Sequence, residues 1–490
     1  MGVIKRQGIK NTIITYVGIL IGFVSLIFIQ PHLLSSSELG LVRILLSFSS
    51  FIATILPLGV SNINVRYFPF FKDESKKHHG YFGLMLLFPL VGCVFGSVII
   101  FLFKDFIVNQ YIQESKLFVD YFFYVFPLSI LIALLTAVNS YAWALYKTSV
   151  PSFLSDILNR LLFILVIVLY FLKVIDLNQF VLLFASLYVI QLSILLIYVF
   201  IVDKPTFIID FKFLKQIDVS GMIKYGLLLM LTSMSSISLR YLDSIMIAKF
   251  LPLAFVGIYS IAAFISTIIE TPLLSMERIA TAKIAHAWSI NNVEEIRKIY
   301  FMSSKYMSLL GGILLIGILT NVNDPLGLLP AEYSGGIMVT FIMSIGAFIN
   351  MATGVNYSIL FNSSKYIYGV MFIVVLLIMT IVGNMIFIPL YGIVGAAIAT
   401  AFASVVYNLL KFFYIWKVFK MQPFDISMVK ILGAMTLCFG INYFLPAIDN
   451  HIASIIVRSA GITLVYASAT YLMNIVPEFH QYIPIIGKKK

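Results

Sequence analysis

The residues of this sequence that could do chemistry are charged side chains inside long apolar segments. An ionisable group at the centre of a bilayer costs about 2.5–3.5 kcal/mol on insertion scales, so it usually faces a cavity or a charged partner. The apolar segments of this chain hold such groups at Arg66, Asp156, Arg160, Arg240, Asp243, Glu270, Glu277 and Arg278. We predict that these side chains carry the function of the protein.

The four arginines of this set, Arg66, Arg160, Arg240 and Arg278, are predicted to line a cavity and bind an anionic substrate. A guanidinium group stays charged when it is desolvated, and its planar fork matches phosphate oxygens. A structural interpretation stays open, because Asp156 is four residues from Arg160 and Asp243 is three residues from Arg240. Each pair can meet on one helix face. Arg66 can also extend its guanidinium to the membrane interface.

The acidic members are predicted to act in coupling or gating. Glu270 is the main candidate, because no Lys or Arg lies three or four residues away from it. Such a carboxyl could take up a proton and so couple the protein to a proton or sodium gradient. Glu277, Asp243 and Asp156 are the other candidates. The alternative is a protonated Glu270 that donates a hydrogen bond to a neighbouring helix.

No cofactor and no metal ion is expected. Cys93 and Cys438 lie in apolar runs, and the six histidines show no metal-ligand spacing. The sequence contains no G-x-x-x-x-G-K-[ST] loop, no zinc-binding His pair and no G-x-S-x-G elbow. We therefore predict that the protein is not an enzyme and does not hydrolyse ATP.

The elements that position these residues are predicted to be transmembrane helices. Hydrophobic residues make up 61% of the 490 residues, charged residues only 11%, and the mean hydropathy is +1.02. Soluble domains carry about 25% charged residues. A bilayer core requires about 20 apolar residues per helix, and the apolar segments then predict an all-α polytopic membrane protein with about 14 transmembrane helices. The predicted spans include 40–66, 366–388 and 392–416.

The distribution of basic residues predicts the topology. Most of the 33 Lys and Arg residues fall on one side of the membrane when the N-terminus is placed inside, as the positive-inside rule requires. Both termini are therefore predicted to be cytoplasmic, and Lys411 is assigned to a cytoplasmic segment. Residues 203–224 are expected to lie along the membrane interface, and residues 284–302 to form a short amphipathic helix.

An internal duplication is predicted from three weak matches at nearly the same offset: Ile9-Lys10 with Ile223-Lys224, Leu39-Gly40-Leu41 with Val256-Gly257-Ile258, and Leu145–Ser149 with Leu360–Ser364. Two six-helix repeats of the same orientation would form facing bundles around a central cavity. The predicted domains are an N-terminal bundle over 1–202, a cytoplasmic linker over 203–221, a second bundle over 222–418, and two extra helices with a basic tail over 419–490.

Several stretches resemble the polysaccharide (O-antigen, Wzx-type) flippases of the multidrug/oligosaccharidyl-lipid/polysaccharide exporter superfamily. They are Glu38-Leu39-Gly40-Leu41, Pro57-Leu58-Gly59-Val60, Arg66-Tyr67, Lys224-Tyr225-Gly226, Tyr241-Leu242-Asp243, Val256-Gly257-Ile258-Tyr259 and Pro389–Ala397. The resemblance covers nearly the whole chain. It implies alternating-access transport of an undecaprenyl-diphosphate-linked oligosaccharide from the inner to the outer leaflet of a bacterial inner membrane. Only Arg66 and Asp243 carry over as family site residues.

The resemblance also implies partners, namely the lipid-linked oligosaccharide, membrane lipids, and a polysaccharide polymerase and glycosyltransferases; nucleic acid is not expected. Two functions of the same fold stay open, a lipid II-type flippase and a cation-coupled multidrug antiporter. The antiporter is disfavoured, because it would need an acidic cavity and the N-terminal half offers only Asp156 beside Arg160. A membrane glycosyltransferase or ligase would need a larger outer loop than any found here.

Overall fold

The computed structural model describes residues 2–442, 448 and 450–475, without the side chains of residues 2–9, 12, 231–233 and 235–240. The described chain is almost entirely helical and contains no strand. Eleven of its helices are long and apolar enough to cross a membrane. The predicted all-α polytopic membrane fold is therefore confirmed, whereas the count of fourteen spans stays a prediction.

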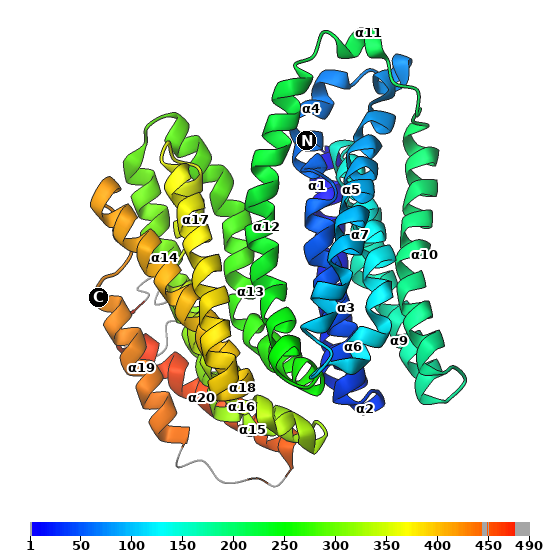
Figure 1. The fold of residues 1–490 in the computed structure, drawn as a ribbon. Helices are drawn as coiled ribbons and strands as arrows, with labels where there is room; N and C mark the ends of the chain where they lie inside the picture. The colour runs from blue at the N-terminus through cyan, green and yellow to red at the C-terminus, as the bar shows by residue number, and fades with distance from the viewer. Residues whose placement is uncertain (1, 443–447, 449, 476–490) are drawn as a thin grey trace. The chain divides into compact units, whose positions relative to one another are not determined.

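The chain forms two compact units, Met1–Gly257 and Ile258–Lys490. The predicted boundaries of the two repeats are not tested by this division and stay predictions. The helices of the first unit (Figure 1) are α1 (Gly2–Val24), η1 (Ser25–Ile29), α2 (Gln30–Leu33), α3 (Ser36–Ile55), α4 (Val60–Phe71), η2 (Glu74–Gly80), α5 (Tyr81–Asn109), α6 (Lys116–Tyr121), η3 (Phe122–Tyr124), α7 (Val125–Ala144), α8 (Ser149–Phe153), η4 (Leu154–Leu158), α9 (Asn159–Phe171), α10 (Leu177–Asp203), α11 (Phe211–Leu214) and α12 (Val219–Phe250).

Helix α3 is the central helix of the first unit and packs against α7 and α12. It begins at a capping box, in which the Ser35 side chain accepts from the backbone N–H of Glu38 and the Glu38 carboxylate accepts from the N–H of Ser35. It ends where Leu58 and Gly59 adopt positive φ, 50° and 77°. This break divides the predicted span 40–66 into α3 and α4. Gly59 suits the break, because only glycine adopts a positive φ at little cost.

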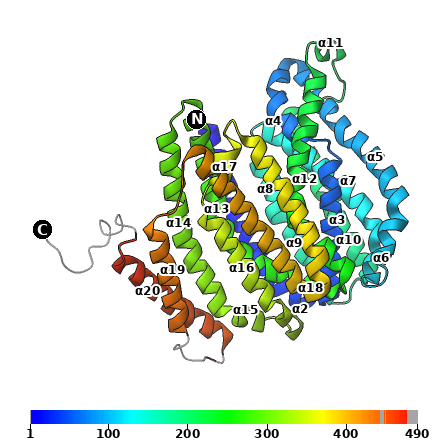
Figure 2. The same ribbon diagram turned by 60° about the vertical axis from the view of Figure 1, so that its left-hand side comes forward.

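The helices of the second unit (Figure 2) are α13 (Ala254–Ser289), whose first turn belongs to the first unit, α14 (Val293–Asn321), α15 (Asn323–Gly327), η5 (Ala331–Gly336), α16 (Ile337–Ala352), α17 (Asn356–Phe361), α18 (Tyr366–Phe419), α19 (Ile426–Asn442) and α20 (His451–Leu472). The prediction of a separate amphipathic helix over 284–302 is wrong. Helix α13 continues to Ser289 and α14 starts at Val293, so this stretch contains the end of one long helix, a short turn and the start of the next long helix.

Helices α19 and α20 lie side by side and pack on α14 (Figures 1 and 2). Their shared core contains Met435, Cys438, Ile462 and Tyr466. The Tyr466 hydroxyl also donates to the Leu309 carbonyl oxygen of α14 at 3.0 Å. The last two helices are thus an integral part of the second unit.

A left-handed turn joins the α4–α5 loop to the linker that follows α10. Lys77, His78 and His79 have φ between 48° and 54°, a conformation that costs about 1–2 kcal/mol per residue. Contacts to the linker offset this cost. His78 Nε2 lies 2.9 Å from Asp203 Oδ1, and His79 Nδ1 lies 3.1 Å from Asp210 Oδ2. The linker is therefore fixed to the loop by two histidine–carboxylate contacts.

Acid is expected to release this linker. The N–H of Phe213 and the His79 ring hold the pKa of Asp210 below its ordinary value of 3.8. A carboxyl whose pKa is lower in the folded than in the unfolded state stabilises the fold above its unfolded pKa, and this contribution is lost as the pH falls below about 4. The protection factors of amide hydrogen exchange over residues 204–218, which correct for the intrinsic pH dependence of the exchange rate, should therefore fall below that pH.

In Asp210→Asn, the protection factors over residues 204–218 should already be low at neutral pH and should not fall further on acidification. The exposed Glu74, replaced by Gln, is the control and should behave like the wild type. Equal exchange in Asp210→Asn and wild type at pH 7 would contradict the assignment of Asp210 as an anchor of the linker.

Candidate functional site

Arg66 on α4 is the predicted site residue with the most informative surroundings in the first unit. Its guanidinium carbon lies 4.4 Å from the centre of the Tyr225 ring and 5.7 Å from that of Tyr67. The side chain is exposed, and no carboxylate in the described part of the chain pairs with it. Cation–π contacts hold a guanidinium through its face. The N–H donors around its edge are left available for an anion.

Two glycines bring α4 and α12 close enough to build this arrangement. A Cβ at Gly59 would overlap the backbone of Gly226, and a Cβ at Gly226 would lie 2.5 Å from Ile63 Cδ1. The close approach places Tyr225 of α12 over Arg66 of α4. The motifs Pro57-Leu58-Gly59 and Lys224-Tyr225-Gly226 therefore meet at one place, although they lie far apart in the sequence.

Arg160 on α9 is held by the backbone of α1. Its Nη1 donates to the Gly18 carbonyl oxygen, and its guanidinium also interacts electrostatically with Asp156. Asp156 lies in the π-helical segment η4. Gly18 and Gly22, four residues apart on α1, face Asp156 and Arg160 respectively, with no room for a Cβ at either position. Arg160 thus takes part in helix packing, and a role in substrate binding stays a prediction.

Gly22→Leu is expected to push Arg160 away from α1 and to lower the melting temperature, because any Cβ at Gly22 would overlap the guanidinium. Overpacking costs about 1–3 kcal/mol, and a lost hydrogen bond to a charged group adds about 1.5–3 kcal/mol. The measurement is thermal unfolding of the purified protein in detergent. Gly440→Leu on α19, where nothing lies within 4 Å of the added Cβ, is the control. Equal melting temperatures for Gly22→Leu and wild type would refute the packing role.

The remaining candidates of the first unit are Arg240 and Asp243 on α12. The Arg240 side chain lies outside the described residues, so its pairing with Asp243 is not tested. Asp243 itself is buried, with 5% of its surface exposed. Both roles stay predictions.

In the second unit, two half-buried carboxylates of α13 lie near the buried Lys411 of α18 and form a charged cluster with it. Glu270 Oε1 accepts a hydrogen bond from Asn350 Nδ2 of α16 at 2.9 Å. Lys411 of α18 interacts electrostatically with Glu277 and Glu270, and more strongly with Glu277. Its Nζ lies 4.1 Å from the centre of the Tyr407 ring. Glu270 and Glu277, both predicted as coupling residues, are thus brought to one lysine.

Arg278 does not share this environment. It follows Glu277 on α13, but its side chain is exposed, whereas Glu277 is half-buried. Neighbouring residues on a helix point about 100° apart. A role of Arg278 in substrate binding stays a prediction.

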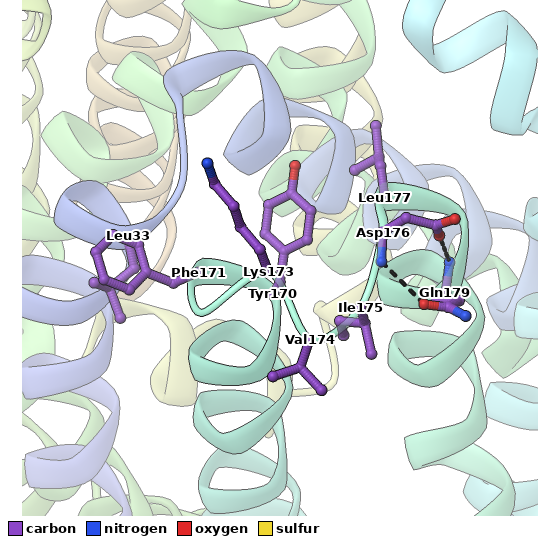
Figure 3. Close-up of a pocket in the computed structure, with 9 residues that line it drawn as sticks. All are labelled: Leu33, Tyr170, Phe171, Lys173, Val174, Ile175, Asp176, Leu177 and Gln179. Carbon is purple, nitrogen blue, oxygen red and sulfur yellow. Dashed lines mark hydrogen bonds between the residues drawn. The ribbon is translucent and has the colours of Figure 1, made fainter.

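Figure 3 shows a pocket of about 720 Å³ in the first unit, between the end of α2 and the α9–α10 loop. Leu33 and Phe171 supply apolar walls, and Lys173 is its basic residue. Asp176 forms a capping box with Gln179 at the start of α10. None of the predicted site residues lines this pocket.

Several solved structures with a similar fold are described as transporters or flippases. No family model matches the sequence, and no curated protein is similar to it in sequence. The structure described as "Lipid II flippase MurJ, inward closed conformation" matches with a TM-score of 0.74 and 17% identity, over 96% of this chain and 100% of that one. The chain shares the fold of this flippase structure.

Two further transporters match the same fold. An inward-facing multidrug resistance MATE family transporter of the MOP superfamily matches with a TM-score of 0.67 and 14% identity, over 82% of this chain and 94% of that one. A MOP superfamily transporter from Pyrococcus furiosus, described as having a binding pocket of reverse polarity, matches with a TM-score of 0.54 and 16% identity, over 85% and 95%. The fold shared by these transporter structures is therefore matched along most of the chain.

Lys411 is a candidate site residue that could not be recognised from the positive-inside count alone. Its assignment to a cytoplasmic segment stays a prediction, but only 2% of its surface is exposed. Near the end of an apolar segment, a count of charges does not distinguish a basic side chain that points into the protein from one that points to the solvent. A usable signal was present, because Ser404, Asn408 and Lys411 follow one another at helical spacing and mark a polar stripe on α18.

Proposed function

We propose that the protein is a flippase that moves a polyprenyl-diphosphate-linked oligosaccharide, the repeat unit of a surface polysaccharide such as O-antigen, from the inner to the outer leaflet. It would act by alternating access in a bacterial inner membrane, with both termini in the cytoplasm. Glycosyltransferases that build the substrate and a polymerase that consumes it are the expected partners.

Arg66 is the single observation that carries this proposal. A guanidinium held by the faces of Tyr67 and Tyr225, with no carboxylate partner among the described residues, is suited to a diphosphate. A drug cation would be repelled by the same group. The multidrug alternative is therefore disfavoured.

A lipid II-type substrate is the second candidate, and the likeness to the MurJ structure favours it. Both candidates carry a polyprenyl diphosphate, so Arg66 has the same role in each. They differ in the attached group, which is an oligosaccharide in one case and a saccharide with a peptide in the other.

Coupling is proposed to reside in the acidic residues. Glu270 and Glu277 are the main candidates, since both interact with the buried Lys411, and Asp243 and Asp156 are the others. The sequence offers no nucleotide-binding loop, so a proton or sodium gradient is the energy source that this proposal requires.

A reconstituted flipping assay tests the function. Purified protein in vesicles should move a fluorescent undecaprenyl-diphosphate oligosaccharide between leaflets faster than protein-free vesicles do, while a fluorescent organic cation should not be exported. A parallel lipid II sample separates the two glycolipid candidates. Export of the cation, with no movement of either glycolipid, would overturn the proposal in favour of the antiporter.

A further inference from the structure

The cluster around Lys411 contains one more negative charge than positive charges. Glu270 and Glu277 are separated by seven residues on α13, which is about 10.5 Å along a helix axis, and Lys411 interacts with both of them. No oxygen of either carboxylate lies within 4.0 Å of Nζ in the described structure. The lysine is almost completely buried nonetheless, with 2% of its surface exposed. The two carboxylates and one ammonium leave a net charge of −1.

We propose that Lys411 is a built-in counter-ion of Glu270 and Glu277, so that the cluster is neutralised by one proton and excludes sodium. This inference rests on the proposed function only in assuming that an ion gradient drives the protein. The reaction is uptake of one proton by a carboxylate oxygen, after which the cluster holds one carboxylate, one carboxylic acid and one ammonium and is neutral.

The lysine disfavours a metal cation for an electrostatic reason. A sodium ion bound at either carboxylate would lie near the ammonium that interacts with both of them, and like charges in a buried site repel strongly. A proton on a carboxylate oxygen removes a negative charge without adding a second cation beside the first. A proton is therefore the ion that fits this cluster.

The groups that face the cluster do not supply an alternative titration near neutral pH. From α16, the neutral amide of Asn350 donates to Glu270. Tyr357 of α17 and Tyr407 of α18 interact electrostatically with Glu277, and phenols titrate only at alkaline pH. Apart from Lys411 itself, the carboxylates are thus the groups of this cluster that can take up the proton.

The test is the sodium dependence of thermal unfolding, which needs no substrate and no transport. The melting temperature of purified wild-type protein at pH 8 should be the same in sodium chloride and in potassium chloride. Lys411→Met keeps the buried stem and removes the charge, which leaves two uncompensated carboxylates. This variant should melt about 3 °C or more higher in sodium than in potassium chloride, because a ligand that binds only the folded state stabilises it.

Two controls make the result specific. Lys417→Ala removes an exposed lysine of the same helix and should show no sodium effect. Glu277→Gln combined with Lys411→Met removes one of the two carboxylates and should abolish the sodium effect of the single variant. If Lys411→Met does not fold, Lys411→Gln replaces it.

A sodium-dependent melting temperature in the wild type would overturn the proposal, as would a folded Lys411 variant without a sodium response. Neither outcome depends on what the protein transports. A negative flipping assay with a positive sodium response in Lys411→Met would therefore reject the proposed substrate and leave the counter-ion role of Lys411 standing.

Discussion

The Arg66→Ala variant is expected to lose most glycolipid flipping while it remains folded and inserted. The exposed guanidinium supports no ion pair among the described residues, so its removal should change the melting temperature little. A hydrogen bond to a charged group contributes about 1.5–3 kcal/mol, which corresponds to about a 10- to 150-fold loss of affinity for the diphosphate. The measurement is the initial rate of flipping in vesicles, together with binding of the polyprenyl diphosphate.

The aromatic contacts of Arg66 allow a sharper version of this experiment. Tyr225→Phe keeps the ring that lies 4.4 Å from the guanidinium carbon and should flip at nearly the wild-type rate. Tyr225→Leu removes the ring and should show a loss of a few-fold, since a cation–π contact at an exposed site is worth about 0.5–1 kcal/mol. Arg66→Lys keeps the charge but not the planar fork, so it should fall between wild type and Arg66→Ala.

Lys76→Ala is the matched control, because it removes an exposed positive charge from the loop that follows α4. It should flip normally if the effect of Arg66 is local. Flipping by Arg66→Ala at the wild-type rate would reject Arg66 as a substrate residue. Equal losses in Arg66→Ala and Lys76→Ala would point to a general effect of surface charge instead.

The long helices of this protein could be predicted from the sequence because each contains a long apolar run. Such runs are visible without any structure. The breaks were harder to place. The stretch 40–66 stays largely apolar through Val60, and the backbone conformation of Leu58 and Gly59 divides it. A break formed by residues that are themselves apolar leaves little trace in a hydropathy pattern.

The pairing of charged residues could be predicted only in part, because pairing was judged from spacing along one helix. Asp156 and Arg160 do interact, but the guanidinium also donates to Gly18 of another helix. Glu270 has no basic neighbour on its own helix, yet Lys411 approaches it from α18. Partners supplied by other helices cannot be deduced from the spacing of residues within one helix.

Among the glycines of the second unit, those of the Pro389–Ala397 motif have the clearest structural role. Helix α18 runs from Tyr366 to Phe419 and is interrupted at Gly392, whose φ is 60° and ψ −140°. A Cβ at Gly395 would overlap the carbonyl oxygen of Phe387. The chain therefore turns so tightly that the helix after the break packs directly on the backbone of the helix before it.

Gly395→Ala is accordingly expected to prevent folding or to lower the melting temperature more than any other single methyl group added to this unit. The atom that blocks the new Cβ belongs to the backbone, so no side chain can rotate to make room. Overpacking of this kind is one of the few mechanisms by which a single substitution costs more than about 4 kcal/mol. Gly392→Ala should cost less, about 1–3 kcal/mol for its strained φ. Thermal unfolding in detergent, with the yield of folded protein, measures both.

Gly433→Ala on α19 separates this clash from a general intolerance of substituted glycines. Nothing lies within 4 Å of a Cβ at Gly433, so the added methyl group should stabilise the helix by roughly 0.5–1 kcal/mol. From highest to lowest, the expected order of melting temperatures is therefore Gly433→Ala, wild type, Gly392→Ala and Gly395→Ala. If Gly395→Ala unfolds at the wild-type temperature, the two halves of α18 cannot approach as closely as this geometry requires, and the break at Gly392 would then be a flexible joint with no fixed packing.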